Sequence, residues 1–332
     1  MRRVNMKKKF KAKKPKKTFK LWKKIFLVLL FGSSTFVTIR LLAHFKLNHS
    51  NEDFLRFMLE NQNVFVEDTK SNSSYFQDIM NQLIHFDLKN PITILSQNYK
   101  GLTSQDIVAL KEEEQQEVLK NPYPENTVTE PNIYIYNTHQ SENYKATSFL
   151  EYSVEPNVMM VDYLLKEQLE KNGHQVLVEE GSIYDVRASL GLNYAGSYQA
   201  SRVLMEEAKA NYSSLTYFID VHRDSLTHDR TTITYEGETY ASILFIVGLE
   251  NPNYQVNLDF TTRIHDGLNS KINGLSKGIY KKEGEGVNGV YNQDFSARTI
   301  LIEIGGPENT IDEVYRTTLI LSEVLNEVIQ ND

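Results

Sequence analysis

The sequence contains no cysteine. Disulfide bonds, cysteine-ligated zinc sites and thiol nucleophiles are therefore excluded. The sequence also lacks an internal repeat and a glycine-rich phosphate-binding loop, so neither a repeat architecture nor a P-loop nucleotide site is expected. The 332 residues, of which 40% are apolar, leave room for one good-sized core and an accessory region.

Acidic residues are absent from the first 24 positions, which hold 13 lysines and arginines. The formal net charge of −7 is therefore an average over two unlike parts. Beyond residue 24 the chain carries 23 basic and 43 acidic residues, a net charge of −20. This acidic part of the chain, residues 25–332, is called the body below. Its charge argues against nucleic acid as a partner, because phosphate backbones require a basic surface.

A long apolar run follows the basic tail. It covers residues 25–45, about the length that spans a bilayer, and its one charged residue, Arg40, lies near one end, where the side chain can snorkel to the interface. No Ala-x-Ala-like site closes the run, which argues against a cleaved signal peptide. A basic segment that abuts an apolar one matches the positive-inside pattern better than it matches a nucleic-acid-binding tail. We therefore expect a single-pass cell-membrane protein with a cytoplasmic N-terminus and an extracellular or intermembrane body.

Four regions follow from these features. They are a basic cytoplasmic tail, a transmembrane anchor, a stalk or membrane-proximal region with a linker, and a catalytic domain, at residues 1–24, 25–45, 46–130 and 131–332. Apolar residues three and four apart predict a mostly helical stalk, with helices at 51–67, 75–86 and 104–119.

The fourth region alternates apolar strands with amphipathic helices. This alternation predicts an α/β domain with a largely parallel twisted sheet and helices on both faces. A glycine- and lysine-rich stretch at 271–290 is expected to be a long loop. We expect strands at 133–136, 174–178, 215–221 and 299–304, a hairpin of 231–236 with 240–247, and helices at 157–171, 184–212 and 253–268. Asn309 or Thr310 is expected to cap a last helix that runs to about Ile329, with Glu313 completing a Thr-x-x-Glu capping box.

Three of the expected strands bring ionisable residues to their ends. The strand at 133–136 runs into a polar cluster with His139 and Glu142, the strand at 215–221 runs into His222, and the strand at 299–304 contains Glu303. The carboxyl edge of an open α/β sheet is where ligands bind. We therefore expect these side chains to form one site.

The residue types in this set are those of a zinc hydrolase, in which three nitrogen or oxygen ligands leave a fourth position for water. His139 and His222 are candidate imidazole ligands, and Glu142 or Glu155 is the candidate carboxylate ligand. Glu303 is the candidate general base, because a charged residue inside an apolar strand needs a partner or a chemical role.

Further polar residues near the strand ends allow two interpretations. Asp220 and Asp224 are candidates for orienting the metal ligands. A second group either lines the groove or binds glycan, or else serves as turn and capping residues; it consists of Arg223, Asp224, Asn292, Gln293 and Asp294.

Several motifs of the catalytic region resemble the stage II sporulation protein P family. Their order and spacing match across residues 132–330. The resemblance implies a membrane-anchored peptidoglycan hydrolase that is similar to zinc-dependent N-acetylmuramoyl-L-alanine amidases, and some members also cut stem-peptide crosslinks. The motifs are YNTHQSE at 136–142, DVHRDS at 220–225, VGLENPN at 247–253, YNQDFS at 291–296, and LIEIGG at 301–306 followed by Asn309 and Thr310.

The resemblance also implies roles for single residues. It marks His139, His222 and Glu303 as functional. Its His-x-x-Glu motif favours Glu142 as the third ligand, whereas the wider amidase fold places a glutamate ligand where this chain has Glu155.

The expected cofactor is Zn²⁺, and the expected partners are peptidoglycan, the membrane and other wall-remodelling proteins. The alternative function is a catalytically inactive wall-binding or scaffold subunit of a wall-remodelling complex. Retention of the two histidines and the glutamate argues against that alternative.

Overall fold

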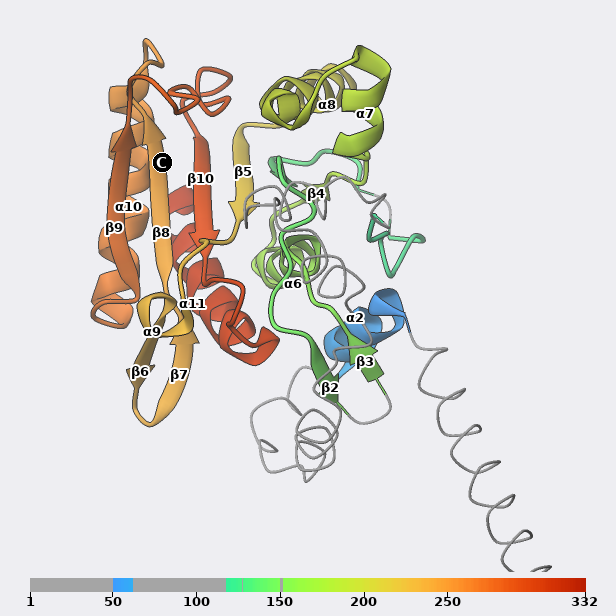
Figure 1. Cartoon of the computed structure of the whole chain (residues 1–332), viewed down its shortest axis with the longest axis vertical. Coiled ribbons are helices and arrows are strands. Elements are labelled where there is room, and N and C mark those ends of the chain that lie inside the picture. Colours follow the sequence, from blue (N-terminus) through green and yellow to red (C-terminus); the bar gives the residue numbers. More distant parts are fainter. Residues whose placement is uncertain (1–49, 62–117, 127, 150–151) are drawn as a thin grey trace, which may run out of the picture. The chain divides into compact units, whose positions relative to one another are not determined.

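A computed structural model describes residues 50–61, 118–126, 128–149 and 152–332. The centre of this part is a six-stranded sheet in the order β4-β1-β5-β10-β8-β9 (Figure 1). The strands of the chain are β1 (Ile133–Tyr136), β2 (Thr147–Phe149), β3 (Tyr152–Val154), β4 (Val176–Val178), β5 (Tyr217–His222), β6 (Thr232–Tyr235), β7 (Glu238–Ala241), β8 (Ile243–Gly248), β9 (Ser276–Lys282) and β10 (Thr299–Ile304). The helices are α2 (Asn51–Glu60), α6 (Val158–Lys171), α7 (Ile183–Leu190), η1 (Tyr194–Gly196), α8 (Ser197–Asn211), α9 (His228–Thr231), α10 (Tyr254–Lys271) and α11 (Ile311–Gln330).

The sheet is largely parallel. Strands β4, β1, β5 and β10 run in one direction, whereas β8 pairs antiparallel with β10 and parallel with β9. Buried on both faces, β1 and β10 are nearly continuous apolar runs, as parallel strands in the middle of a layered domain are. The expected α/β domain with a largely parallel sheet is confirmed.

Helices cover both faces of the sheet. One face packs against α6, α10 and α11 and forms the larger core, in which Ile135, Val221 and Ile302 of the central strands are fully buried. The other face carries Tyr134 and Phe218, which pack with Met205 of α8, among other residues. Successive residues of a strand point to opposite faces, so each central strand contributes to both cores.

The last helix begins where the sequence predicts it. Thr310 caps α11 by accepting a hydrogen bond from the backbone N–H of Glu313, whose carboxylate in turn accepts from the Thr310 N–H. This reciprocal capping box stabilises the first turn of α11 directly after β10. The helix therefore starts close to the strand that carries Glu303.

Helix α2 packs on the α/β domain that follows it. Phe54 lies in the larger core and its ring centroid is 5.5 Å from that of Tyr152. The side chain of Asn51 donates to the Glu155 carbonyl at 3.0 Å and accepts from the Glu155 N–H at 3.3 Å. The first ten residues of the expected stalk helix thus share a core with the domain that follows. The division of the chain at residue 131 stays a prediction.

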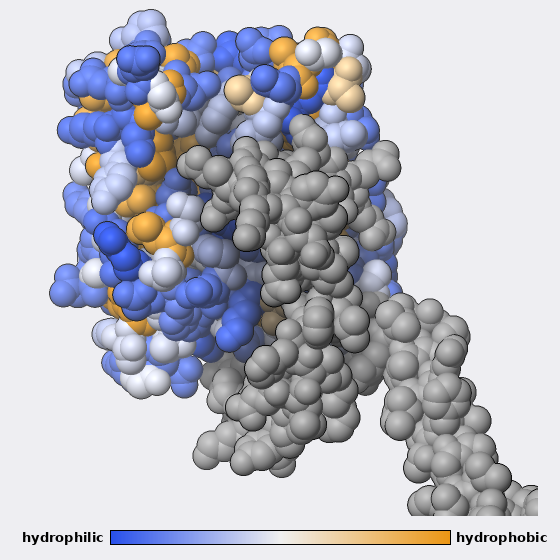
Figure 2. Space-filling model, in the orientation of Figure 1, coloured by the Kyte–Doolittle hydropathy of each residue, from blue (hydrophilic) through white to orange (hydrophobic). Residues whose placement is uncertain are grey.

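The expected tail and anchor, at 1–24 and 25–45, lie outside the described residues, as do the expected helix at 75–86 and nearly all of the one at 104–119. Within the described part of the chain, no helix is long and apolar enough to cross a membrane. Figure 2 shows that the described surface is mainly hydrophilic in this view, with smaller hydrophobic groups between polar ones.

Two local expectations were wrong. The stretch at 271–290 is not one long loop, because α10 extends to Lys271 and β9 occupies Ser276–Lys282 at the sheet edge. Pairing with the apolar β8 outweighs the poor strand propensity of glycine and lysine. The expected hairpin forms only between β6 and β7, around Glu236 and Gly237, which both have positive φ angles of 51° and 88°. At Ser242 the chain leaves this hairpin, and β8 joins the main sheet.

Candidate metal centre

The carboxyl ends of three adjacent parallel strands converge on one face of the sheet. Asp220 is in register with Tyr136 of β1 and with Leu301 of β10, and His222 is in register with Glu303. Side chains of paired residues in parallel strands point to the same face. These residues therefore lie on the face covered by α8.

His139, Glu142 and His222 form a cluster that can hold a metal ion. One ligand atom from each residue lies within 4.8 Å of the others. Nδ1 of His139 is 3.6 Å from Oε1 of Glu142, and Nδ1 of His222 is 3.3 Å from Oε2 of Glu142. Two imidazoles and one carboxylate are a common ligand set of catalytic zinc sites, so the residues present fit this metal.

The polypeptide fixes Glu142 from two sides. The backbone N–H of Glu142 donates to the His139 carbonyl at 3.2 Å, which closes the turn after β1. The backbone N–H of Arg223 donates to Oε2 of Glu142 at 2.8 Å, and Nε of Arg223 donates to the Asn143 carbonyl at 2.8 Å. Arg223 therefore joins the loop after β5 to the turn after β1.

Glu155, the other candidate for the third ligand, is exposed and follows β3. Its backbone pairs with Asn51 of α2. The structure brings Glu142, and not Glu155, to the two histidines.

Each charged group of the cluster affects the pKa of its neighbours. Burial alone would raise the pKa of Glu142, but His222 and His139 outweigh it and hold that pKa well below its usual range. Burial likewise opposes a charge on His222, yet Asp220 and Glu142 raise the pKa of the imidazole well above its usual value. Two carboxylates thus attract a positive charge to this position, and a divalent cation would supply that charge.

Asp220 occupies the position of an orienting carboxylate behind His222. Its Oδ1 lies 3.0 Å from Nε2 of His222, on the opposite side of the ring from Glu142. Metal-binding histidines commonly have such a carboxylate at the second nitrogen, which sets the tautomer and ring orientation.

A chain of hydrogen bonds extends from Asp220 to the loop before β10. Thr138 donates to Asp220 through its backbone N–H at 2.9 Å and its hydroxyl at 2.7 Å. The same hydroxyl lies 2.9 Å from Oγ of Ser201, which accepts from Nδ2 of Asn292 at 3.0 Å. All four residues are buried. Asn292, which lies 70 residues after His222 in the sequence, is thereby connected to Asp220.

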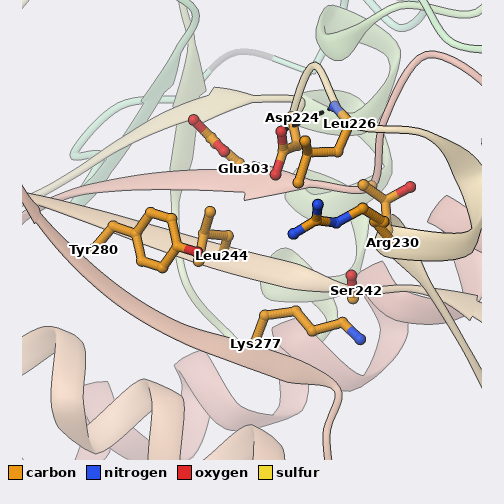
Figure 3. Close-up of a pocket in the computed structure, with 10 residues that line it drawn as sticks. Asp224, Leu226, Arg230, Ser242, Leu244, Lys277, Tyr280 and Glu303 are labelled. Atoms are coloured by element: carbon orange, nitrogen blue, oxygen red, sulfur yellow. Dashed lines mark hydrogen bonds between the residues drawn. The ribbon is translucent and has the colours of Figure 1, made fainter.

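Glu303 lies at the edge of a cavity of about 200 Å³. Burial, and then the charge of Asp224, raise the pKa of Glu303 to about 7. Figure 3 shows Glu303 and Asp224 on one side of this cavity, with Lys277 and Tyr280 across from them. A carboxylate that titrates near neutral pH at the edge of an open cavity has the properties of a general base.

The remaining candidates have definite places in the fold. Gln293 is buried and joins the end of β8 to the loop, since it donates to the Ile246 carbonyl at 2.7 Å and accepts from the Gly248 N–H at 2.9 Å. Asp294 is exposed and pairs with Arg202 at 2.8 Å. The Asp224 carboxylate accepts from the Leu226 N–H at 3.0 Å and lines the cavity beside Glu303. A contact of any of them with substrate stays a prediction.

Two tyrosines beside the cluster were missed by sequence reasoning. The ring of Tyr194 stacks on that of His139 with the ring centroids 4.8 Å apart, and the ring of Tyr198 is stacked with that of His222 with the centroids 6.5 Å apart. Their spacing of four residues puts both on one side of the η1–α8 segment. That spacing was visible in the sequence, but nothing in it told which side meets the metal site.

Comparisons with known proteins agree with the motifs. Residues 49–326 match the family model described as stage II sporulation protein P (SpoIIP). Stage II sporulation protein P of Bacillus subtilis (strain 168) is 34% identical over 217 residues, which are 63% of this chain and 54% of that protein. The chain thus spans about half the length of this curated relative. Among solved structures, the CwlD amidase from Clostridioides difficile in complex with the GerS lipoprotein matches with a TM-score of 0.41 and 12% identity, over 60% of this chain and 100% of that chain.

Proposed function

The chain belongs to the stage II sporulation protein P family, and we propose that it is a membrane-anchored peptidoglycan hydrolase that depends on zinc. It hydrolyses the amide between N-acetylmuramic acid and L-alanine. Membership of the family supports a role related to cell-wall hydrolysis during sporulation.

One observation carries the proposal. Two histidines and a glutamate converge at the carboxyl edge of the sheet, and Glu303 projects from the same face as His222. A ligand set for zinc and a carboxylate with a pKa of about 7 thus lie on one sheet face. Zinc-dependent amide hydrolysis uses both, because the water must be activated and the leaving amine must receive a proton.

A bound zinc ion supplies Lewis-acid chemistry, since it lowers the pKa of a water molecule and polarises a carbonyl. His139, Glu142 and His222 would hold this ion. The Glu303 carboxylate accepts a proton from the attacking water and then gives it to the amide nitrogen as the carbon–nitrogen bond breaks. Asp220 keeps the ring of His222 in place, and the Arg223 N–H does the same for Glu142.

The decisive experiment digests purified peptidoglycan with the full chain and identifies the products by mass spectrometry. Amidase action should release intact stem peptides and leave peptide-free glycan, whereas cleavage of crosslinks should leave peptides on the sugar. The variants His139→Ala and His222→Ala should each lose both the reaction and stoichiometric zinc binding. His265→Ala is the matched control, because His265 lies 2.6 Å from Oγ of Ser276, away from the cluster. Wild-type protein that holds zinc and releases nothing would favour the inactive wall-binding subunit.

Anchoring is a separate part of the proposal. It rests on the basic residues 1–24 followed by the apolar residues 25–45. Protease added to wall-stripped cells should digest the body and spare the tail. A protected body would contradict this topology.

A further inference from the structure

A buried arginine beside the metal centre has no acidic partner. Arg187 of α7 is only 8% exposed, and among the described residues no carboxylate pairs with it. Its Nε is buried and has no hydrogen-bond acceptor. A buried guanidinium without a counter-charge is costly, so such groups are normally paired. Lys166, which is also buried, illustrates the usual solution: it donates to the Val176 carbonyl at 2.6 Å and pairs with Glu170.

Aromatic rings provide what support Arg187 has. Its guanidinium carbon lies 5.9 Å from the centroid of Tyr184 and 5.4 Å from that of Tyr194. Tyr194 also stacks on His139 at 4.8 Å. Cation–π contacts of this kind hold a guanidinium in position and leave its N–H groups available, because the ring faces offer no strong acceptor.

Arg187 lines a recess of about 30 Å³ together with Thr138, His139, Gln140 and Tyr194, among other residues. This volume is about that of two water-sized probes, so the recess takes one small group and no sugar ring. The recess is fixed to the metal centre by Gln140, which donates to the Gly181 carbonyl at 2.8 Å and accepts from the Ile183 N–H at 2.9 Å. The start of α7 is therefore tied to the turn that carries His139.

We propose that Arg187 and this recess bind a carboxylate of the substrate peptide next to the scissile amide. The inference rests on the proposed function, which places that amide over the residues that hold the metal. On the glycan side the lactyl carboxyl is consumed in the amide, so the nearest carboxylates belong to the peptide. Guanidinium recognises a carboxylate through paired charge-assisted hydrogen bonds. Arg187 is thus a specificity residue that distinguishes an acidic peptide from its amidated form.

The test uses the full chain and two N-acetylmuramoyl tripeptides that differ in one group. One carries D-glutamate after L-alanine, with a free α-carboxylate, and the other carries D-isoglutamine, with a carboxamide there. Binding by calorimetry and kcat/KM are measured for both peptides. The wild type should prefer the carboxylate form by roughly 10- to 100-fold, as expected for a hydrogen-bonded charge pair.

Arg187→Met removes the charge and keeps most of the volume. The preference should fall to about one, the carboxamide peptide should be bound as before, and cooperative unfolding should persist. Arg316→Met is the matched control, since Arg316 also lies against a tyrosine, Tyr240, but donates to the Thr239 carbonyl at 2.8 Å. That variant should keep the wild-type preference.

The two proposals fail in different ways. Equal binding of both peptides by the wild type, or binding of neither, refutes the carboxylate recess whether or not the amide is cut. If Arg187→Met binds both peptides more weakly by the same factor, the proposal is refuted as well, because the arginine would then act on the structure alone. A preference in binding without any hydrolysis supports the recess and refutes the hydrolase.

Discussion

Glu303 and His222 are register partners on adjacent parallel strands, β10 and β5. Backbone hydrogen bonds therefore set the spacing between the candidate base and a candidate metal ligand, and both side chains leave the same face of the sheet. His139 and Glu142 lie instead in a turn, which depends on Arg223 for its position. The sheet therefore fixes His222 and Glu303, whereas loop contacts position His139 and Glu142.

The first prediction separates the two candidate carboxylate ligands. Glu142→Gln should weaken zinc binding strongly, and added zinc should partly restore it, because an amide oxygen is a poorer ligand than a carboxylate. Glu155→Gln should keep wild-type zinc, since Glu155 is exposed and pairs through its backbone with Asn51 of α2. Zinc content after dialysis against graded chelator concentrations measures both. If Glu142→Gln kept its zinc and Glu155→Gln lost it, Glu155 would be the carboxylate ligand instead of Glu142.

The second prediction concerns Glu303 in catalysis. Glu303→Gln should keep its zinc and its affinity for peptidoglycan but lose turnover by roughly 100-fold or more, the usual effect of removing a general base. The wild-type kcat/KM should rise as pH increases and Glu303 loses its proton, and Glu303→Gln should lack this rise. Zinc loss from the variant would show that Glu303 is a ligand, and near-normal turnover would show that it is not the base.

The third prediction is about stability without metal. The pKa of Glu303 is about 7 in the folded protein against 4.5 as its ordinary value, because burial opposes the charge. The folded state therefore binds a proton more tightly than the unfolded state, and this contribution to stability is lost as pH rises from about 4.5 through 7. Glu303→Gln should be more stable than the wild type at pH 8, by on the order of 1–3 kcal/mol, and the difference should shrink at pH 4.

Urea unfolding of both proteins in chelator, at the two pH values, measures this difference. Glu323→Gln serves as a control, because Glu323 lies on the surface and forms an ion pair with Lys271. A gap between Glu303→Gln and the wild type that is the same at both pH values would show that the glutamate is not desolvated.

Much of the fold was predictable, because its signals are local. Apolar runs that end in polar clusters identified β1, β5 and β10, and a Thr-x-x-Glu pattern identified the start of α11. Strand β9 was not predictable, since its sequence SKGIYKK has little strand propensity and forms only because β8 presents an apolar partner. Strand formation here is a tertiary effect that no local window contains.

The site was predictable to the level of residue types but not of geometry. His139, Glu142 and His222 stood out by their places at strand ends, yet both Glu142 and Glu155 remained open until distances could be compared. Arg187 gave no signal at all, because a lone arginine on a helix is ordinary in sequence. What distinguishes it is burial without a partner, which only the packing of α7 against the turn after β1 reveals.

The last prediction tests the hydrogen-bond chain behind His222. Thr138→Val removes the hydroxyl that donates to Asp220 at 2.7 Å and keeps the shape of the side chain. Asp220 should then hold the His222 ring less firmly, so zinc affinity should fall by up to roughly 10-fold, the low end of the effect of losing a direct partner of a metal ligand, because the Thr138 N–H still donates to Asp220. Thr318→Val on α11 is the matched control, since its buried hydroxyl donates to the Val314 carbonyl of the same helix at 2.9 Å.

The two variants lose the same group from a buried site. Only Thr138→Val should change zinc affinity, measured by competition with a chromogenic chelator. Asn292→Ala should act in the same direction but less strongly, because it reaches Asp220 through Ser201 and Thr138. If Thr138→Val and Thr318→Val bind zinc equally well, these hydrogen bonds position only the loop before β10 and do not affect the metal centre.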